Sequence, residues 1–236
     1  EFGIISYLHS QNDILVSGGE VDSLSVSIGV PFSENLVESF YLNYFMKGIE
    51  RESHNNNSLI VAGHSYHTLE PSITITMNGI TEKKSFKSGA NEGDLIYLSK
   101  PLGTGYLLAA YFQNSKLFKH QDFHNLMTHL KMSNKLVVNI ARKFECQTMT
   151  DISGFGLASH LIDICKNSNL SAHILLNDEI LINSNKDLLN KFESTGFRNN
   201  YLSSFEHLEL KKANELIKIM YDPQTNGPVL VVLNKK

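Results

Sequence analysis

The sequence predicts a two-domain protein of the α/β or α+β class, and three observations lead to this fold class. Its 236 residues, 42% of them apolar, are enough for one large domain or two modest ones. Alternating strands and helices with an apolar face occur in both halves of the chain. A polar, lysine-rich stretch with two glycines, Thr81–Gly93, lies between the halves and is the best candidate for a domain boundary. We therefore expect domains at residues 1–84 and 93–236.

The first domain is expected to contain strand, helix, strand and strand in that order. Residues 22–30 alternate strictly, which predicts a strand whose buried face comprises Leu24, Val26, Ile28 and Val30. Pro31 ends this strand, and Ser33 is placed to cap the following helix. Residues 58–62 predict a short strand that ends at Gly63-His64, and residues 73–77 predict a second alternating strand. The apolar face of the helix is wide and comprises Leu36, Val37, Phe40, Tyr41, Tyr44, Phe45 and Ile49.

The second domain is expected to mix helices and strands, without repeats of a solenoid type. Helical segments are expected at 106–111 and 136–144, and another helix follows Gly156 with Leu157, Leu161, Ile164 and Cys165 on one face. A strand is expected around His173–Leu176, followed by one or two helices. The terminal strand is expected at 229–233.

Composition excludes several classes of protein. Charged residues make up 19% of the chain and the net charge is -3, so there is no signature of a nucleic-acid-binding protein. Two cysteines, Cys146 and Cys165, are too few for a disulfide framework and are typical of a cytoplasmic protein. No apolar run approaches the roughly 18 residues of a membrane span, and no signal-peptide pattern is present. Because the chain begins with Glu1 rather than Met, we expect a fragment or a trimmed protein.

Four segments combine glycine with acidic, amide or hydroxyl side chains at turns or strand-to-helix transitions. They are Asn12-Asp13 with Gly18-Gly19, Ala62–Ser65, Lys100–Gly105 and Thr150–Gly156. Glycine lets backbone N–H groups approach a phosphate closely, and a helix N-terminus beyond it favours the negative charge. Mg²⁺ on a nucleotide takes one or two carboxylates besides phosphate and water oxygens. Asp13 and Asp151 meet that requirement, and together they could hold one metal–nucleotide cluster.

Each segment also has an ordinary structural interpretation. A single Asp before a Gly-rich turn more often forms the turn or caps a helix than binds a metal. Lys100 precedes its glycines, so Lys100–Gly105 is not a P-loop and is expected to be a turn into a helix. His64 is more often structural than catalytic in such a position, and both cysteines are expected to be buried and inert. Spacing alone therefore leads to a possible nucleotide-binding α/β protein and no further.

Five segments, in the same order, resemble the selenide, water dikinase (selenophosphate synthetase) family over nearly the whole chain. Asn12-Asp13-Ile14 with Gly18-Gly19 resembles the family's Ser-Asp-Ile/Val…Met-Gly-Gly helix start. Ala62-Gly63-His64-Ser65 with Glu70-Pro71 resembles Gly-Gly-His-Ser/Thr…Pro-Glu-Pro. Leu98–Gly105 resembles Leu-Thr-Lys-Pro-Leu-Gly-Thr/Ile-Gly, and Met149–Leu157 with His160-Leu161 resembles Met-Thr-Asp-Val-Thr-Gly-Phe-Gly-Leu…His-Leu. Asp222–Gly227 resembles Asp-Pro-Gln-Thr-Ser-Gly.

The resemblance implies the fold shared with aminoimidazole ribonucleotide synthetase. Residues 1–84 would then be an α/β dimerisation and nucleotide-binding domain whose strands form a barrel across a homodimer, and 93–236 an α+β domain. It also implies a reaction in which ATP, selenide and water give selenophosphate, AMP and phosphate. ATP and Mg²⁺ would be required, and the partners would be selenide, ATP and a second copy of the chain, with no direct contact to nucleic acid or membrane.

The same resemblance assigns site residues. Asp13 would bind Mg²⁺ and lie against the nucleotide, and Asp151 would be a second Mg²⁺ ligand. Ala62, Gly63 and His64 match the family's nucleotide-contacting triplet, which in the dimer is offered to the partner's site.

The chain also departs from the family. Before the point matched by Glu1, the family carries a glycine-rich arm with a Cys or selenocysteine, a Lys and a metal-binding Asp, so we expect no catalytic nucleophile here and no turnover by the chain alone. The family also continues past the point matched by Lys236. Ala62 replaces a glycine, His67 an aspartate and Pro228 a glycine; proline lacks an N–H donor, so its loop is expected to bind phosphate less well or to serve structurally.

Two alternatives to the enzyme stay open. One is a non-catalytic or regulatory relative that keeps the dimeric fold. The other is another ATP-using member of the superfamily, against which the wording of Thr150–Gly156 argues.

Overall fold

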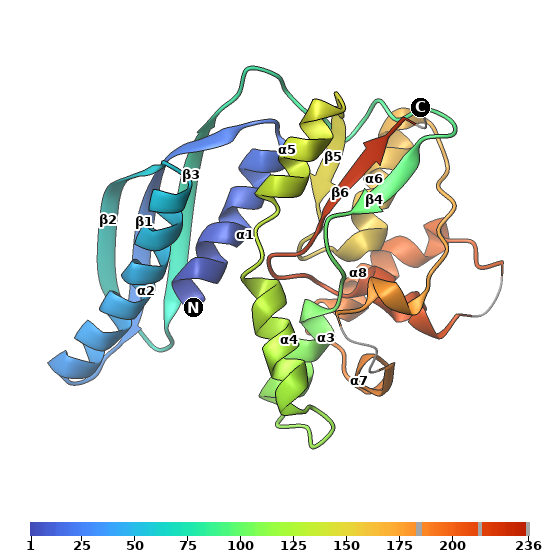
Figure 1. Cartoon of the computed structure of the whole chain (residues 1–236). Coiled ribbons are helices and arrows are strands. Elements are labelled where there is room, and N and C mark those ends of the chain that lie inside the picture. The colour runs from blue at the N-terminus through green and yellow to red at the C-terminus, as the bar shows by residue number, and fades with distance from the viewer. Residues whose placement is uncertain (183–185, 212–213, 235–236) are drawn as a thin grey trace. The chain divides into compact units, whose positions relative to one another are not determined.

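The computed structural model describes residues 1–182, 186–211 and 214–234. The chain divides into two compact units, Glu1–Lys84 and Ser85–Lys236, which are described separately below (Figure 1). None of the helices within the described ranges combines the length and the apolar composition that crossing a membrane requires.

The first unit is a three-stranded sheet with two helices. The strand order is β2-β1-β3, with β1 parallel to β2 and antiparallel to β3 (Figure 1). The order of strand, helix, strand and strand predicted for this region is confirmed, and a further helix, α1, precedes it. The elements are α1 (Phe2–Val16), β1 (Glu20–Pro31), α2 (Asn35–Asn55), β2 (Leu59–Thr68) and β3 (Ser72–Ile80).

The core of the first unit lies between the sheet and the two helices. The alternating side chains predicted to face inward are all buried, and they pack against α1 and α2 because both helices cover the same face of the sheet. Burying such side chains stabilises the fold by about 1.5–3 kcal/mol each. The cluster comprises Ile4, Tyr7, Leu8, Leu24, Val26, Ile28, Val30, Phe45 and Ile49.

Helix α1 ends at the glycine pair that the sequence suggested as a phosphate loop. The N–H of Gly19 donates to the carbonyl of Ile14 at 2.9 Å, and the N–H of Gly18 donates to that of Leu15 at 3.0 Å. Gly18 has φ +93°, a conformation that side chains with a Cβ avoid. This is a Schellman helix end. The expectation that Asn12-Asp13 starts a helix or lies in a loop is therefore wrong, because both residues lie inside α1.

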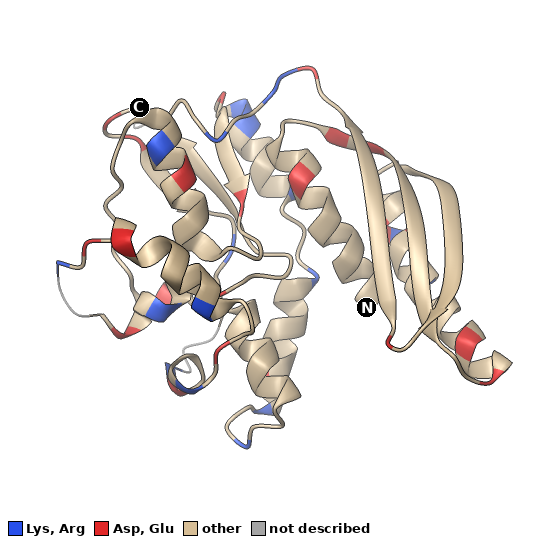
Figure 2. Cartoon of the chain, turned by 180° about the vertical axis from the view of Figure 1, so that it is seen from behind, with Lys and Arg blue, Asp and Glu red and all other residues tan. Residues whose placement is uncertain are grey.

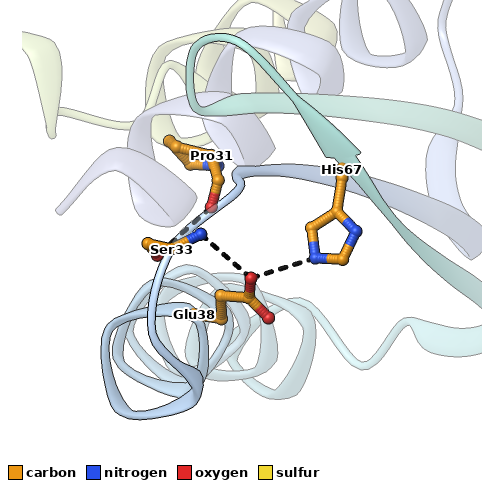
Figure 3. A network of polar contacts seen from close by, with 4 residues as sticks. All are labelled: Pro31, Ser33, Glu38 and His67. Atoms are coloured by element: carbon orange, nitrogen blue, oxygen red, sulfur yellow. Dashed lines mark hydrogen bonds and ion pairs between the residues drawn. The ribbon is translucent and has the colours of Figure 1, made fainter.

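Helix α2 begins without the cap expected from Ser33. The Ser33 hydroxyl donates to the carbonyl of Pro31 at 3.3 Å, and its N–H donates to Glu38 Oε1 at 3.1 Å (Figure 3). The same carboxylate oxygen lies 3.0 Å from Nε2 of His67 on β2, and these contacts lower the pKa of Glu38. Ser33 is thus held by Glu38 and cannot cap the helix, whose N-cap is Glu34.

The wide apolar face predicted for α2 is only partly buried. Phe45 and Ile49 lie in the core, whereas Leu36 and Phe40 are exposed. The N-terminal turns of α2 project beyond the strands, so they have no sheet to pack against within the first unit (Figure 1).

Strand β2 is longer than predicted. It pairs with β1 from Leu59 to Thr68, so Gly63-His64 lies in the middle of the strand and does not end it. The expectation failed because β2 is an edge strand with most side chains exposed, so its residues show no polarity period.

The second unit has a sheet of order β4-β6-β5, antiparallel throughout, with helices around it (Figure 1). Helix α5 packs against β6, and α6 follows β5 and packs against it. The strands are β4 (Leu95–Leu98), β5 (Thr148–Asp151) and β6 (Val229–Leu233). The helices are α3 (Thr104–Phe112), α4 (His120–Leu130), α5 (Lys135–Lys143), α6 (Gly156–Ser168), α7 (Lys186–Lys191) and α8 (Phe197–Ser204). The 3-10 turns are Asp178–Ile180, Phe205–His207 and Glu215–Tyr221.

Most elements predicted for this unit are confirmed. The terminal strand β6 and helix α5 have the expected places, and Leu157, Leu161 and Ile164 of α6 are buried on one face. The strand expected around His173–Leu176 is wrong, because those residues belong to no strand of the described chain and Leu175 is largely exposed. A short apolar run forms a strand only when a neighbouring strand supplies hydrogen bonds.

Candidate functional site

Asp151 lies at the end of β5, where the chain turns into helix α6. It pairs with Val229 of β6 and is 5% exposed. The loop before β6 holds the turn that follows: the N–H of Ile152 donates to the carbonyl of Pro228 at 2.8 Å, and the N–H of Gln224 donates to the carbonyl of Ser153 at 2.9 Å. Asp151 is therefore a buried carboxylate placed by two segments that are about seventy residues apart in sequence.

The side chain of Asn200 holds the same turn. Its Nδ2 donates to the carbonyl of Gly154 at 2.9 Å and to that of Tyr221 at 3.0 Å. Asn200 is buried on α8 and was not singled out by the sequence, because an Asn without a nearby turn pattern gives no signal.

The segments Lys100–Gly105 and Asp222–Gly227 meet in space and form one structure. Gln224 Oε1 accepts from the N–H groups of Gly103 and Thr104, at 3.0 and 3.2 Å, and from the Thr104 hydroxyl at 3.2 Å. Asp222 Oδ2 accepts from the N–H of Gly105 at 3.1 Å. A Cβ on Gly105 would lie 2.4 Å from the carbonyl oxygen of Pro223, so only glycine allows this approach. The loop thus caps the N-terminus of α3.

The cap determines whether the Lys100–Gly105 segment can bind a phosphate. Its prediction as an ordinary turn into a helix is confirmed, since α3 starts at Thr104. The N–H groups at the start of α3 already bind Gln224 and Asp222, so they are not available to a phosphate. Burial raises the pKa of Asp222 to about 7, although its hydrogen bonds with Gln224, Gly105 and Tyr106 lower it. The carbonyl oxygen of Pro228 accepts from the N–H of Ile152, while its role toward a phosphate stays a prediction.

Lys100 and Asn226 secure the C-terminal end of α4. Lys100 is buried, and its Nζ donates to the carbonyl of Met132 at 2.9 Å and to that of His129 at 3.4 Å. Asn226 Nδ2 donates to the carbonyl of Leu130 at 2.8 Å. Burial lowers the pKa of Lys100 to about 7, and burial together with the Lys100 charge lowers the pKa of His129 to about 3. Lys100 therefore has a structural position in the second unit.

The nucleotide-contacting residues expected in the first unit lie on different elements. Asp13 is exposed on α1, which packs mainly over β3 and β1. Ala62, Gly63 and His64 are exposed in the middle of β2, at the opposite edge of the sheet from β3. The His64 ring stacks on Tyr66 with their centroids 6.2 Å apart. Within one copy of the first unit, the fold does not gather Asp13 and the triplet at one place.

The carboxylates present fit a metal–nucleotide complex better than a metal alone. Among the residues that the structure describes, no three His, Cys, Asp or Glu side chains are grouped to hold a metal ion. Mg²⁺ commonly takes only one or two carboxylates, with phosphate and water oxygens completing its shell. Asp13 and Asp151 belong to different units, so their meeting at one metal stays a prediction.

Comparison with known proteins places these features in a family. The family model described as AIR synthase related protein, C-terminal domain, matches residues 91–232. The chain belongs to this family. The aminoimidazole ribonucleotide synthetase-like fold expected from the resemblance is thereby confirmed.

Curated relatives of this AIR synthase related protein carry the name expected from the five segments. Selenide, water dikinase of Haemophilus influenzae (strain 86-028NP) is 28% identical over 236 residues, which are 99% of this chain and 67% of the relative. Selenide, water dikinase of Campylobacter jejuni (strain RM1221) is 28% identical over 239 residues, with 100% of this chain and 68% of the relative covered. The chain thus spans about two thirds of the length of these relatives, and its similarity to selenide, water dikinases is confirmed.

Solved structures with a similar fold include proteins of other names. Thiamine monophosphate kinase from Aquifex aeolicus has a TM-score of 0.69 at 16% identity, with 100% of this chain and 73% of that chain covered. Hydrogenase maturation protein HypE in complex with ATP has a TM-score of 0.68 at 16% identity, with 99% and 63% covered. At this identity the likeness concerns the fold alone.

Proposed function

We propose that the chain is part of an ATP-dependent phosphotransferase of the selenide, water dikinase type. In this reaction ATP, selenide and water give selenophosphate, AMP and phosphate. The observation that carries the proposal is the match to selenide, water dikinases over 99% of the chain, with the five segments in the same order. The fold supports it, because a solved structure of the same fold is a complex with ATP.

Asp151 and Asp13 are the proposed Mg²⁺ ligands. Asp151 is supported by its place at the end of a buried strand, in a turn that the Asp222–Pro228 loop and Asn200 hold in position. Asp13 is supported by its exposure near the end of α1, where a carboxylate is accessible to a ligand. These two carboxylates would hold Mg²⁺, whose charge would offset the negative charge that develops during phosphoryl transfer.

Ala62, Gly63 and His64 are the proposed nucleotide contacts. A Cβ at position 63 would meet the carbonyl oxygen of Val26 at 3.6 Å, an ordinary contact distance. Packing within the chain therefore does not require glycine there, whereas close approach of a ligand would. Because the triplet and Asp13 lie over opposite edges of one sheet, we propose that the triplet serves the site of a second copy.

Homodimerisation through the first unit is part of the proposal. Strands β2 and β3 contain no Lys, Arg, Asp or Glu, and charged residues in this unit gather at strand ends and on helices (Figure 2). The sheet face opposite the helices carries Ser25, Ser27, Thr74 and Thr76. Edge strands without charged residues, one of them as long as β2, are an unusual surface to leave in water, and pairing with a second copy would cover them.

The cysteines of this chain do not supply the nucleophile of the proposed reaction. Burial raises the pKa of Cys146 and of Cys165, and a thiol must ionise to react. The two cysteines therefore offer the proposed reaction no readily ionised thiol.

Product analysis tests the proposal. In the protein as the cell makes it, we expect AMP to form from ATP only when selenide and Mg²⁺ are both present, and Asp151→Asn to abolish its formation. Release of ADP with another acceptor would favour a kinase with a different substrate, as in thiamine monophosphate kinase. No nucleotide turnover with tight nucleotide binding would favour the non-catalytic relative.

A further inference from the structure

A buried histidine of helix α6 contacts residues on both sides of Asp151 in the chain. His160 is 5% exposed and lies one turn into α6, facing the end of β5. Its Nδ1 lies 3.3 Å from the hydroxyl of Thr150, and the N–H of Ser153 points at its Nε2 at 3.5 Å. Thr150 precedes the carboxylate and Ser153 follows it by two residues. One imidazole ring therefore touches the chain on both sides of Asp151.

The hydrogen bonds define the form of this imidazole. Since the N–H of Ser153 is a donor, Nε2 must be the accepting nitrogen and Nδ1 must carry the proton. Nδ1–H then donates to Thr150 Oγ1, whose own proton donates to the carbonyl of Asp151 at 3.2 Å. The chain of contacts is consistent from Ser153 to the backbone of Asp151. Burial, the largest influence, lowers the pKa of His160 to about 4, so the ring stays neutral at neutral pH.

The turn after Asp151 is also held by contacts that do not involve His160. The Asp222–Pro228 loop and Asn200 bind backbone groups of Ile152, Ser153 and Gly154, all of them after the carboxylate. The side chain of His160 reaches both the residue before Asp151 and a residue after it. It therefore adds a side-chain contact on each side of Asp151 to the pairing with β6 that already holds Thr150 and Asp151, and so helps to set the direction of the carboxylate.

We infer that His160 is a positioning residue for Asp151: by holding Thr150 and Ser153 it sets the direction of the proposed Mg²⁺-binding carboxylate. This inference rests on the proposed function for the role of Asp151, whereas the contacts of His160 with Thr150 and Ser153 do not depend on it. A neighbour that orients a metal-binding side chain typically changes metal affinity about 10- to 100-fold when it is removed.

Amide hydrogen exchange of the ligand-free chain tests the contacts of His160 with Thr150 and Ser153. The variant His160→Leu replaces the imidazole with an apolar side chain of similar size and removes both contacts. We expect the Ser153 amide to exchange about tenfold or more faster, because it loses its acceptor. The matched control is His129→Leu, since His129 is also 5% exposed and lies in the same unit, but in the last turn of α4. Unchanged exchange at Ser153 in His160→Leu overturns the inference whatever the protein's function.

Metal-dependent nucleotide binding tests the consequence for Asp151. The probe is AMPPCP, with its affinity measured by calorimetry in Mg²⁺ and in EDTA. We expect His160→Leu to weaken the Mg²⁺-dependent affinity about 10- to 100-fold, with little change in EDTA, and His129→Leu to leave both values within about twofold. His160→Gln, which can still accept from Ser153, should recover part of the loss; it also serves as the test variant if His160→Leu does not fold.

Two results separate failure of the inference from failure of the proposed function. If Asp151→Asn weakens binding in Mg²⁺ but His160→Leu and His160→Gln do not, the positioning role is wrong and the proposed function stands. If Asp151→Asn leaves Mg²⁺-dependent binding unchanged, the metal role of Asp151 is wrong, and the inference about its positioning falls with it.

Discussion

Gln224 is the side chain whose removal tests the architecture of the second unit most sharply. It is 3% exposed, and it joins the loop before β6 to the start of α3 across 120 residues of sequence. Its Oε1 accepts from the N–H groups of Gly103 and Thr104, and its Nε2 donates to Oδ2 and to the carbonyl oxygen of Asp222. The variant Gln224→Met keeps the length and volume of the side chain but removes every one of these contacts.

The expected loss follows from the groups left without partners. Two buried N–H groups at the start of α3 would lose their acceptor, and each such group costs about 1–3 kcal/mol. Asp222 would also lose one donor to its carboxyl group, while apolar contacts would be largely kept. We therefore expect the free energy of unfolding to fall by roughly 2–6 kcal/mol.

Urea denaturation followed by circular dichroism measures this change, which suits a chain without tryptophan. The control is Gln121→Met, because Gln121 is exposed on α4 and its side chain donates to that of Asn125, one turn along the same helix. That variant should change the free energy of unfolding by less than about 0.5 kcal/mol. A loss below about 1 kcal/mol for Gln224→Met would refute the capping role assigned to the Asp222–Gly227 loop.

Three further predictions concern other buried groups. Because burial raises the pKa of Asp222 to about 7, the folded protein holds a proton that the unfolded chain releases near pH 4. As pH rises from about 4 to about 7, the free energy of unfolding of the wild type should therefore fall relative to that of Asp222→Asn, by up to ~4 kcal/mol. Parallel urea titrations of the two proteins measure this difference. Asn226→Ala should lower stability more than Asn226→Gly, because both lose the bond to the Leu130 carbonyl but only alanine is strained at φ +43°; equal melting curves would contradict this. Iodoacetamide should label half-buried Cys165 before buried Cys146 in the folded chain, as measured by peptide mass spectrometry. The reverse order of labelling would contradict the burial of the two thiols described above.

Elements with a polarity period could be predicted from the sequence. Leu24, Val26, Ile28 and Val30 alternate because one face of β1 meets α1 and α2 and the other does not, so the pattern records the burial directly. The same holds for α6, whose buried side chains follow the helical repeat. The sequence of β2 shows no alternation of apolar and polar residues, because this edge strand is exposed on both faces.

The candidate site could be predicted only in part, because glycine-rich segments look alike in sequence. Gly18-Gly19 ends a helix, whereas Gly103 and Gly105 start one under a capping loop, and neither use depends on a phosphate. What distinguishes them is the direction of their N–H groups, which is set by partners as distant in sequence as Asp222. His160 is part of one of the five segments but received no role from the sequence, because its contacts to Thr150 and Ser153 arise from the packing of α6 on β5.

The proposed function is tested most directly by asking whether Asp13 and Asp151 bind one cation together with a nucleotide. The measurement is the affinity for AMPPCP in Mg²⁺ of the wild type, Asp13→Asn, Asp151→Asn and the double variant. If both carboxylates hold the same ion, each single variant should weaken binding about tenfold or more, and the double variant should weaken it by less than the product of the two effects. Two effects that multiply, or single variants that bind as the wild type does, would contradict a shared metal site.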